Sequence, residues 1–457
     1  MRNFDAIVVG AGQAGPALAS RLTAAGMTVA LVERDRVGGT CVNTGCTPTK
    51  ALVASAYAAH LARRASDFGI GTGPVTVDFS AVIARAQAIA TRSRENNEAW
   101  LAGMAGLTLI RGQARFTSPT TMTVNAEEIS APRIFLNVGG RPSRPVMPGS
   151  DQVTTLTNEE MLTLDTLPEH LVVVGGSYIG LEFAQMFRRF GAQVTIVEKA
   201  PRLIAHEDPE ISDAIRTMLE AEGIAVRTGA TCITFAATND GIAVGVNCTE
   251  GDRAVVGSHV LLAVGRIPNS DDLGLDKAGI AVDARGYITV NDRLTTNVPG
   301  IWALGDCNGR GAFTHTAWND YEIVAANLLD QGDRRVSQRV PGYALYTDPP
   351  LGRVGMTEVQ ARKTGRPLLV SSRPMTRVSR AIEKGETTGL MKIVADAETR
   401  RILGAAILGT GGDEAIHGIL DMMHADQPLD TLHWAVPIHP TVSELIPTLL
   451  GDLKPAT

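Results

Sequence analysis

"DAIVVGAGQAGPALASRLTAAGMTVALVE", residues Asp5–Glu33, combines a short apolar run, three closely spaced glycines and a terminal acid. The run Asp5–Val9 predicts a strand, Pro16–Gly26 a helix and Thr28–Val32 a second strand. In such a unit the first glycine permits a tight turn, and the second lets backbone amides approach a pyrophosphate. The third lets helix and strand pack closely, and the acid accepts hydrogen bonds from a ribose. The stretch predicts a dinucleotide site made of Gly10, Gly12, Gly15 and Glu33.

The same pattern occurs a second time, starting at the apolar run Leu171–Val174. Gly175–Gly180, a helical stretch, the strand Gln193–Val197 and then Glu198 follow, and the first glycine and the acid are equally far apart in both copies. Ser177 stands where the first copy has its middle glycine, which reduces how closely the backbone can approach a pyrophosphate. Two copies predict two bound dinucleotides, one held permanently and one exchanging.

The acid of the second copy bears on the choice of pyridine nucleotide. Glu198 can accept hydrogen bonds from ribose hydroxyls, and its charge would repel a 2′-phosphate. NADH is therefore favoured over NADPH, although the positive charge of the adjacent Lys199 weakens that preference.

Composition and charge exclude some classes of protein. The chain has 457 residues, 44% hydrophobic and 20% charged, with a formal net charge of -6, so no basic excess favours nucleic acid as a partner. The longest run without charged residues or histidine, Ala6–Ser20, contains glycines and is shorter than the roughly 18 apolar residues of a spanning helix. We expect neither a membrane segment nor a signal peptide, and a cytoplasmic location.

Two of the five cysteines, Cys41 and Cys46, lie close together in "TCVNTGC". A zinc site would need two more ligands in similar pairing, which do not occur, so no metal site is expected. In a regular helix these positions would rise about 7.5 Å, beyond the roughly 7 Å limit for bridged Cα atoms, so a disulfide needs a distorted turn. Gly45 could allow that distortion. Two free buried thiols remain the ordinary alternative, and a neighbouring flavin site would favour a working disulfide.

"GGTCVNTGCTPTK", residues 38–50, closely resembles the active-site signature of the flavin-dependent pyridine nucleotide–disulfide oxidoreductases, and the resemblance covers essentially the whole chain. It implies that the first copy binds FAD, with Asp306 on the ribityl chain. It also implies that Cys46 lies against the flavin and that Cys41 attacks the substrate. The resemblance places further cofactor-binding positions at Gly39, Thr40, Gly139, Gly175, Tyr178, Gly180, Gly265 and Arg266.

Three further side chains have both a role implied by the resemblance and an ordinary alternative. Lys50 and Glu182 match the ion pair beside the flavin, and Lys50 lies one helical turn after Cys46 in a helix expected over 47–63. Two solvated helix charges are the alternative. Tyr178 matches a tyrosine that covers the flavin until the nicotinamide arrives, and its alternative is a packed aromatic at a helix start.

His439 is the candidate acid–base residue, in "IHPTVSELIPTLL". A helix is expected to begin near Thr441, where Thr441 and Glu444 could form a capping box. Alternatively Glu444 orients the His439 imidazole. The stretch resembles the family's His-Pro-Thr-x-x-Glu segment, which acts across a dimer interface on the partner's disulfide, so a homodimer with shared active sites is expected.

The predicted fold is α/β, with two Rossmann-like dinucleotide-binding domains and a C-terminal α+β dimerisation domain. Strand-like stretches at 133–142, 259–269 and 286–306 suggest strands that return from a nucleotide-binding lobe. Residues from about 343 carry no glycine fingerprint, and a strand hairpin is expected there over 390–408. The expected domains are 1–149 and 268–338 for FAD, 150–267 for NAD(P) and 339–457 for the interface.

The substrate is less constrained by the sequence. The leading hypothesis is an FAD-dependent NAD(P)H oxidoreductase that reduces a small disulfide or an oxidant. A dihydrolipoyl dehydrogenase, a mercuric-reductase-like metal-ion reductase and a flavin redox sensor without turnover are alternatives. Metal reduction is disfavoured because the last cysteine is Cys307 and the chain ends "LLGDLKPAT", without the C-terminal cysteine pair of mercuric reductases. The stretch 311–324 resembles the mercuric-reductase-like and chlorine-resistance branch. It predicts the start of a helix whose N-terminus would stabilise negative charge on a reduced flavin.

Overall fold

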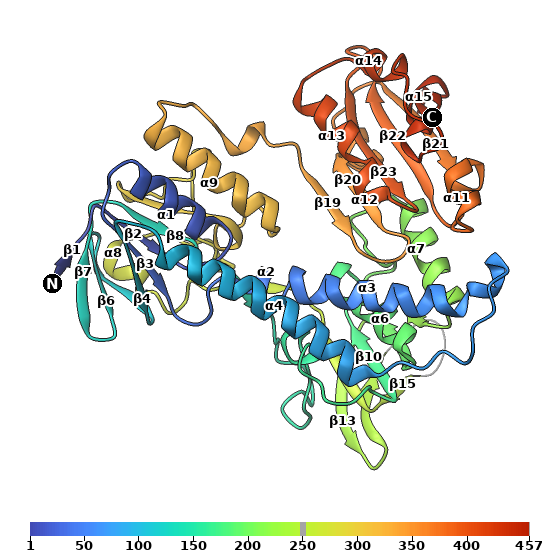
Figure 1. The fold of residues 1–457 in the computed structure, drawn as a ribbon, viewed down its shortest axis with the longest axis horizontal. Coiled ribbons are helices and arrows are strands. Elements are labelled where there is room, and N and C mark those ends of the chain that lie inside the picture. Colours follow the sequence, from blue (N-terminus) through green and yellow to red (C-terminus); the bar gives the residue numbers. More distant parts are fainter. Residues whose placement is uncertain (247–252, 457) are drawn as a thin grey trace. The chain divides into compact units, whose positions relative to one another are not determined.

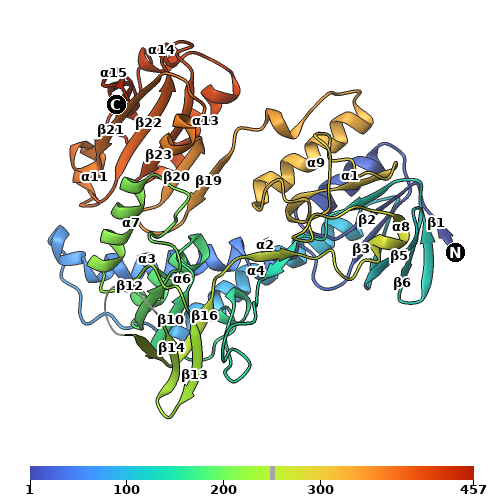
Figure 2. The same cartoon turned by 180° about the vertical axis from the view of Figure 1, so that it is seen from behind.

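The computed structural model describes residues 1–246 and 253–456, shown from two sides in Figures 1 and 2. Its internal contacts divide the chain into two compact units. The first comprises residues 1–51, 83–143 and 264–339, and the second comprises 52–82, 144–263 and 340–457.

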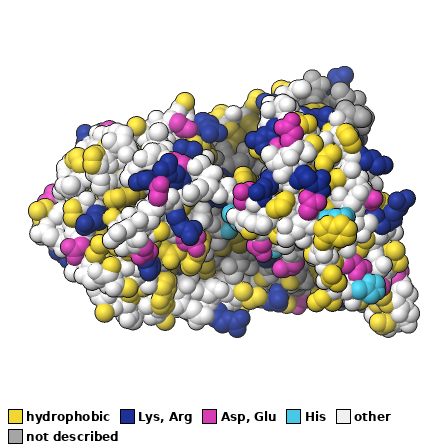
Figure 3. Space-filling view, turned by 90° about the horizontal axis from the view of Figure 1, so that it is seen from above, with side chains coloured by type: hydrophobic (Ala, Val, Ile, Leu, Met, Phe, Trp, Pro, Cys, Tyr) yellow, Lys and Arg dark blue, Asp and Glu magenta, His cyan; other side chains and the backbone are white. Residues whose placement is uncertain are grey.

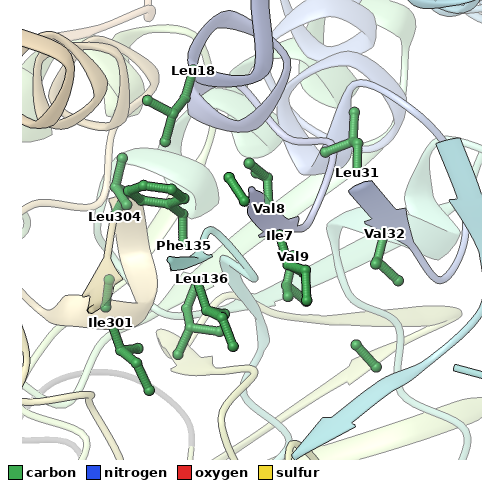
Figure 4. Packing of buried hydrophobic residues seen from close by; sticks show 14 of the residues in the cluster. Ile7, Val8, Val9, Leu18, Leu31, Val32, Phe135, Leu136, Ile301 and Leu304 are labelled. Carbon is green, nitrogen blue, oxygen red and sulfur yellow. The ribbon is translucent and has the colours of Figure 1, made fainter. Parts of the chain in front are cut away.

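The first unit is built on a parallel sheet that contains the first glycine fingerprint. Its strand order is β18-β8-β2-β3-β4, and helices α1 and α9 lie side by side against it (Figures 1 and 2). The central strands β2 and β8 are apolar and buried along their whole length, and Ile7, Leu31 and Phe135 are among the enclosed side chains in Figure 4. The bounds are β2 Ala6–Val9, β3 Val29–Glu33, β4 Leu107–Arg111, β8 Ile134–Leu136, β18 Ile301–Ala303, α1 Ala14–Ala24 and α9 Thr314–Leu329.

Smaller elements complete the first unit. A four-stranded sheet has the order β1-β7-β6-β5, and β9 pairs antiparallel with β17. Short helices α2 and η2 follow two strand ends. The bounds are β1 Arg2–Asn3, β5 Ala114–Ser118, β6 Thr121–Val124, β7 Glu127–Ser130, β9 Gly140–Pro142, β17 Arg266–Pro268, α2 Gly39–Asn43, η2 Gly305–Asn308 and α8 Leu275–Ala278.

The second unit contains the second fingerprint in a parallel sheet of order β12-β11-β10-β16. Helix α6 leaves the glycine turn after β10, and an antiparallel three-stranded sheet, β13-β14-β15, packs next to it. The bounds are β10 His170–Val174, β11 Gln193–Val197, β12 Ala225–Arg227, β16 His259–Leu262, α6 Tyr178–Phe190, α7 Pro209–Ala221, β13 Thr234–Thr238, β14 Gly241–Gly245 and β15 Ala254–Gly257.

The C-terminal part of the second unit is an antiparallel sheet of order β19-β20-β23-β22-β21-β24 with short helices. The expected hairpin over 390–408 is present as β22 and β23. The bounds are β19 Gly342–Leu345, β20 Leu351–Gly355, β21 Leu368–Pro374, β22 Leu390–Asp396, β23 Ile402–Leu408, β24 Lys454–Pro455, α10 Glu358–Arg362, α11 Ser379–Glu383, α12 Gly412–Ala415, α13 His417–His424, α14 Leu429–His433 and α15 Ile446–Gly451.

Two long helices, α3 (Cys46–Arg63) and α4 (Phe79–Ala102), have residues in both units. Within the described part of the chain, no helix combines the length and apolarity needed to cross a bilayer. On the face drawn in Figure 3, acidic and basic side chains are interspersed.

One predicted helix start is wrong. The helix expected from Thr441 begins instead as a short 3-10 turn at Ser443–Leu445, followed by α15 at Ile446. Pro447 lies in the first turn of α15, where its missing N–H costs nothing, so the α-helix starts there. The peptide bond between His439 and Pro440 is cis.

Candidate active site

The first glycine turn is tightly packed on one side and open on the other. Gly10 has a φ of +102°, and a Cβ added to it would lie 2.2 Å from the Asn137 carbonyl oxygen. A Cβ on Gly15 would lie 2.1 Å from the Gly10 carbonyl oxygen, whereas one on Gly12 would meet no atom closer than 3.4 Å. Gly10 and Gly15 are therefore required by the turn itself, and Gly12 keeps the backbone bare on the open side. This shape fits a dinucleotide pyrophosphate.

The buried acid Glu33 ties the turn to the end of β3. One carboxylate oxygen accepts the Ala11 amide at 2.7 Å, and the other accepts the Asp35 amide at 2.8 Å. The carboxylate therefore lies beside the glycine turn, where the sequence places the ribose. Gly39 also comes here, because a Cβ on it would lie 2.8 Å from the Gly12 Cα.

A second group of predicted residues meets at the end of β18. The Arg266 guanidinium donates to the carbonyl of Gly140 and, at 3.4 Å, to the Thr40 hydroxyl. Its Nε lies 3.9 Å from an Asp306 carboxylate oxygen. Burial raises the pKa of Asp306, and the Arg266 charge opposes that shift. Gly139 leads into this group with a φ of +64° and no atom within 4 Å of an added Cβ, so this side is also open.

Asp320, on α9, was missed by the sequence reasoning. It is buried and accepts the Gly305 amide at 2.8 Å and the Asn308 side-chain amide at 2.9 Å, and it pairs with Arg339. These bonds hold the η2 turn that carries Asp306. A single aspartate within a helix gives no local signal for this role.

Cys41 and Cys46 lie on either side of a break between α2 and α3. The break is at Thr44 and Gly45, and a Cβ on Gly45 would lie 2.8 Å from the Thr40 carbonyl oxygen and 3.2 Å from the Cys41 Cα. Gly45 thus permits a close approach of the two segments, a more specific role than the flexibility expected from the sequence. Both cysteines are free thiols, with Cys46 exposed and Cys41 half-buried.

The two sulfurs share a hydrogen bond that makes them chemically unequal. The Cys41 thiol donates to Cys46, which raises the pKa of Cys41 and lowers the pKa of Cys46 to about 6. Burial adds to the rise at Cys41. The hydrogen bond therefore favours the thiol form of Cys41 and the thiolate form of Cys46.

Two further groups stabilise the Cys46 thiolate. The hydroxyl of Thr314, the first residue of α9, lies 3.4 Å from the Cys46 sulfur, and this contact lowers the pKa of Cys46. The positive charge of Lys50, one turn along α3 as expected, lowers it further. A helix start was expected in this stretch, but the specific contact between Thr314 and the thiolate was not. Thr314 and Cys46 are far apart in sequence, so only the packing of α9 reveals their proximity.

The second glycine turn repeats the geometry of the first. Gly175 has a φ of +117°, and a Cβ on Gly180 would lie 2.0 Å from the Gly175 carbonyl oxygen. The Glu198 carboxylate accepts the Gly176 amide at 2.5 Å and the Ala200 amide at 2.6 Å. Tyr178 is half-buried at the start of α6. Outside this turn, Gly265 has a φ of +112° and no atom within 4 Å of an added Cβ.

Glu182 is buried on α6 and accepts the backbone amide of Tyr346 at 3.0 Å. It belongs to the second unit and Lys50 to the first, so their ion pair stays a prediction.

His439 and Glu444 form a hydrogen-bonded pair. The Nδ1 of His439 lies 2.8 Å from a Glu444 carboxylate oxygen, and the imidazole is 74% exposed. The Thr441 hydroxyl accepts the Glu444 amide at 3.2 Å, so Thr441 provides its half of a cap while the Glu444 carboxylate contacts the histidine. With Nδ1 bonded to a carboxylate, Nε2 faces outward and can exchange a proton.

Exposed apolar side chains precede this histidine in the sequence. Trp434, Val436 and Ile438 precede it, and each is at least 78% exposed. Large exposed apolar groups of this kind mark an interaction surface. Among the described residues, no group of three or more histidines, cysteines or acids is placed to hold a metal ion.

Known proteins share both the fold and the sequence. Residues 4–320 match the family described as pyridine nucleotide-disulphide oxidoreductase, and residues 341–450 match its dimerisation domain. The chain is 36% identical over 463 residues to the probable pyridine nucleotide-disulfide oxidoreductase RclA of Escherichia coli, covering 99% of this chain and 100% of that protein. It is 34% identical over 454 residues to dihydrolipoyl dehydrogenase of Thermus scotoductus, covering 97% and 96%. A mercuric reductase of Bacillus cereus is 34% identical over 415 residues, covering 91% of this chain and 66% of that protein.

The same relationship holds among solved structures. The Cu(II) complex of the HOCl-induced flavoprotein disulfide reductase RclA from Escherichia coli matches with a TM-score of 0.90 and 34% identity, covering 99% of both chains. These matches confirm the predicted α/β fold with two dinucleotide-binding domains and a C-terminal dimerisation domain. They also establish an FAD-dependent enzyme class that uses pyridine nucleotides. The chain belongs to the pyridine nucleotide-disulphide oxidoreductases.

Proposed function

We propose that this enzyme transfers electrons from NADH, through FAD, to the Cys41–Cys46 pair and then to a small disulfide or oxidant. The hydrogen bond between the two thiols, together with the Thr314 hydroxyl that contacts the Cys46 sulfur, carries the proposal. A dithiol that re-forms a disulfide needs one stabilised thiolate and one thiol that can be activated, and this pair supplies both.

The residues present fit FAD on the first unit. Gly12 and Gly139 leave backbone open on one side, Glu33 lies at the ribose position, and Asp306 lies at a strand end for a polyol chain. When bound, the flavin supplies the two-electron relay between a nicotinamide and a disulfide. Arg266 and Thr40 are hydrogen-bonded to each other and line the same end of the sheet.

The acid–base partner is His439 of a second copy of the chain. Because the pKa of Cys41 is raised, this thiol needs a base before it can attack a substrate. Glu444 fixes Nδ1 of His439, and the exposed apolar side chains Trp434, Val436 and Ile438 provide a surface for the partner. A homodimer in which each histidine serves the other chain's cysteines satisfies both requirements.

The thiol chemistry balances for a disulfide substrate. His439 removes the Cys41 proton, and the Cys41 thiolate attacks one substrate sulfur to form a mixed disulfide. The first substrate thiolate leaves and takes that proton. The Cys46 thiolate then attacks Cys41, re-forming their disulfide and releasing the second thiolate, which takes a proton from solvent. Each cycle uses two electrons from NADH and returns the pair to its oxidised state.

Glu198 supports NADH as the preferred donor. Its carboxylate is fixed by two backbone amides beside the second glycine turn, where it can accept from ribose hydroxyls and repel a 2′-phosphate. Replacing Glu198 by Ala should raise the Michaelis constant for NADH, and an unchanged constant would remove this argument. A reductase that works through free thiols also suits a reducing compartment such as the cytoplasm.

An anaerobic reductive titration followed by absorbance tests the core of the proposal. Four electrons per flavin should be taken up, with a long-wavelength thiolate-to-flavin band at the midpoint. Uptake of only two electrons would show that the cysteines take no part. In that case a simple flavin oxidoreductase or a redox sensor without turnover would describe the protein better.

His439 has a separate test. His439→Gln should lower disulfide reduction by about 10²–10⁴-fold, as expected for the loss of general acid–base catalysis, while reduction of the flavin by NADH is retained. Equal loss of both half-reactions would mean that His439 acts on folding or assembly. Mixing this variant with a Cys41→Ser variant should leave heterodimers with one intact site, and no recovered activity would contradict sharing across the dimer.

An NADH-oxidation screen would identify the acceptor. Its arms should include small disulfides, dihydrolipoamide in the reverse direction, chlorine oxidants, Hg(II) and Cu(II), the last because the RclA structure from Escherichia coli is a Cu(II) complex. Turnover with dihydrolipoamide and NAD⁺ would identify a dihydrolipoyl dehydrogenase, and turnover with a metal ion alone would identify a metal-ion reductase.

A further inference from the structure

The loop that follows Glu198, residues 199–207, packs directly against the second glycine turn. The Ile204 amide donates to the Gly176 carbonyl oxygen at 2.8 Å. A Cβ on Gly176 would lie 2.6 Å from a Leu203 methyl carbon, so this glycine makes room for the loop. Leu203 and Ile204 are 1% and 2% exposed. The shape of the turn therefore depends on where this loop lies.

The loop contains a residue in an unfavourable backbone conformation. Ile204 has a φ of +44°, a region that β-branched residues rarely enter. Such a residue persists only when surrounding contacts hold it in place. The hydrogen bond to Gly176 is one of these contacts.

The other end of the loop is fixed by a strand of the dimerisation domain. Both carboxylate oxygens of Glu207 lie 3.1 Å from Nε of Arg353, on β20, and the two side chains are 0% and 3% exposed. The Tyr343 hydroxyl, on β19, also donates to Glu207. The same hydroxyl lies 2.9 Å from the His206 ring. Removing Arg353 would leave a buried carboxylate without its main counter-charge, so Glu207 would leave this position.

We propose that Arg353 is a positioning residue for the pyridine-nucleotide site, acting through Glu207 and the loop 199–207 on the Gly175–Gly180 turn. The dimerisation domain then contributes to nucleotide binding within its own chain, in addition to any role in assembly. The inference rests on the proposed assignment of this turn to NADH. It assigns a function to a buried ion pair that the disulfide chemistry does not use.

Arg353→Met keeps the length of the side chain and removes its charge. Calorimetry should show NAD⁺ binding to the purified flavoenzyme weakened by about three- to thirtyfold, the range typical for residues that act through a neighbouring element. The Michaelis constant for NADH should rise similarly, with kcat at saturation changing less than twofold. Unchanged NAD⁺ affinity in a folded Arg353→Met protein would overturn the proposal.

Milder variants keep the test decisive if Arg353→Met does not fold. Tyr343→Phe removes one bond to Glu207, and Leu203→Ala removes the methyl group that lies against Gly176 while leaving the backbone bond from Ile204, so each should weaken NAD⁺ binding. Combined with Arg353→Met or Tyr343→Phe, Leu203→Ala should show less than additive effects, because both act through one loop. Additive effects, or no effect of either mild variant, would contradict the mechanism.

Two controls distinguish this inference from a general loss of domain stability and from a wrong assignment of the glycine turn. Ile419→Ala destabilises the core of the dimerisation domain, where Ile419 is fully buried on α13, without touching the loop. It should lower the melting temperature and leave NAD⁺ affinity unchanged, and a matching loss of affinity would show that Arg353 acts only through domain stability. Gly180→Ala should abolish NAD⁺ binding. If it does not, the assignment of the turn fails, which is distinct from failure of the Arg353 proposal.

Discussion

The loops that follow the two fingerprint acids begin alike and end differently. In each copy the acid accepts the amide of the residue after the first glycine, Ala11 or Gly176. In each, the loop then returns an amide to the carbonyl of that residue at 2.8 Å, from Gly38 or Ile204. Both donors have positive φ, +97° and +44°. The same hydrogen-bond frame therefore closes both turns.

Beyond the frame the two loops have different partners. The first continues into α2, where Gly39 packs on Gly12 and the chain reaches Cys41. The second continues to Glu207 and its ion pair with Arg353. Glycine at 38 needs no outside support for its positive φ, whereas isoleucine at 204 does. The comparison shows that the same pair of hydrogen bonds can support a loop that leads to a redox pair or a loop that is attached to another domain.

The largest expected effect follows from replacing Cys41, to which the first loop leads. Cys41→Ser should lower disulfide reduction by at least about 10³-fold, the scale of losing a nucleophile, because no other described thiol is placed beside Cys46. Flavin reduction by NADH should survive, measured by stopped-flow absorbance. Loss of both half-reactions would mean that the site is misassigned.

The next largest effect is expected from replacing the last glycine of each turn, because each replacement should abolish binding of a different cofactor. Gly15→Ala and Gly180→Ala each bring a Cβ about 2 Å from a carbonyl oxygen, so both turns must open. Gly15→Ala should yield protein with little flavin, whereas Gly180→Ala should keep flavin and lose NAD⁺ binding. Flavin content by absorbance and calorimetry with NAD⁺ distinguish them. The opposite pattern would reverse the assignment of the two copies.

A smaller effect is expected where the two loops differ in residue type. Gly38→Ala places a side chain at a φ of +97° and a Cβ 2.6 Å from that of Val42, so it should cost about 1–3 kcal/mol of unfolding free energy. Gly26→Ala, also at positive φ but with nothing within 4 Å, provides the control and should cost less. Equal losses in chemical denaturation would mean that backbone conformation alone matters.

The smallest expected effect is on the thiolate. The pKa of Cys46, lowered to about 6 mainly by its bond from Cys41 and further by Thr314 and Lys50, makes it a thiolate above that pH and a thiol below it. In the two-electron-reduced enzyme the long-wavelength band should therefore disappear as the pH falls through about 6. Thr314→Val should move this transition to higher pH, and Thr314→Ser should leave it near its original position. An unchanged transition in Thr314→Val would show that the Thr314 hydroxyl does not lower the pKa of Cys46.

The sequence was sufficient for the parts of the molecule that local patterns encode. The two glycine turns, their acids, the hairpin over 390–408 and the helix after Cys46 all follow from short-range rules, and the structure contains each. The pair of His439 and Glu444 is also local. These features depend on residues only a few positions apart, or on repeats of a known spacing.

Contacts between distant segments could not be predicted in the same way. Thr314 meets Cys46 only because α9 packs on the first sheet, and Glu207 meets Arg353 only because two domains share an interface. In each case the partner of the residue lies far away in the sequence, so the residues around it give no sign of the contact.

Because the two thiols differ in pKa, the reduced enzyme is expected to react with a damaging oxidant at one sulfur first. Oxidants attack thiolates, so Cys46, whose pKa is lowered to about 6, is expected to be oxidised before Cys41. A sulfenic acid formed on Cys46 lies beside the Cys41 thiol, and their condensation releases water and restores the resting disulfide. The sulfur that takes the damage therefore has its repair partner already in contact, and NADH completes the recovery.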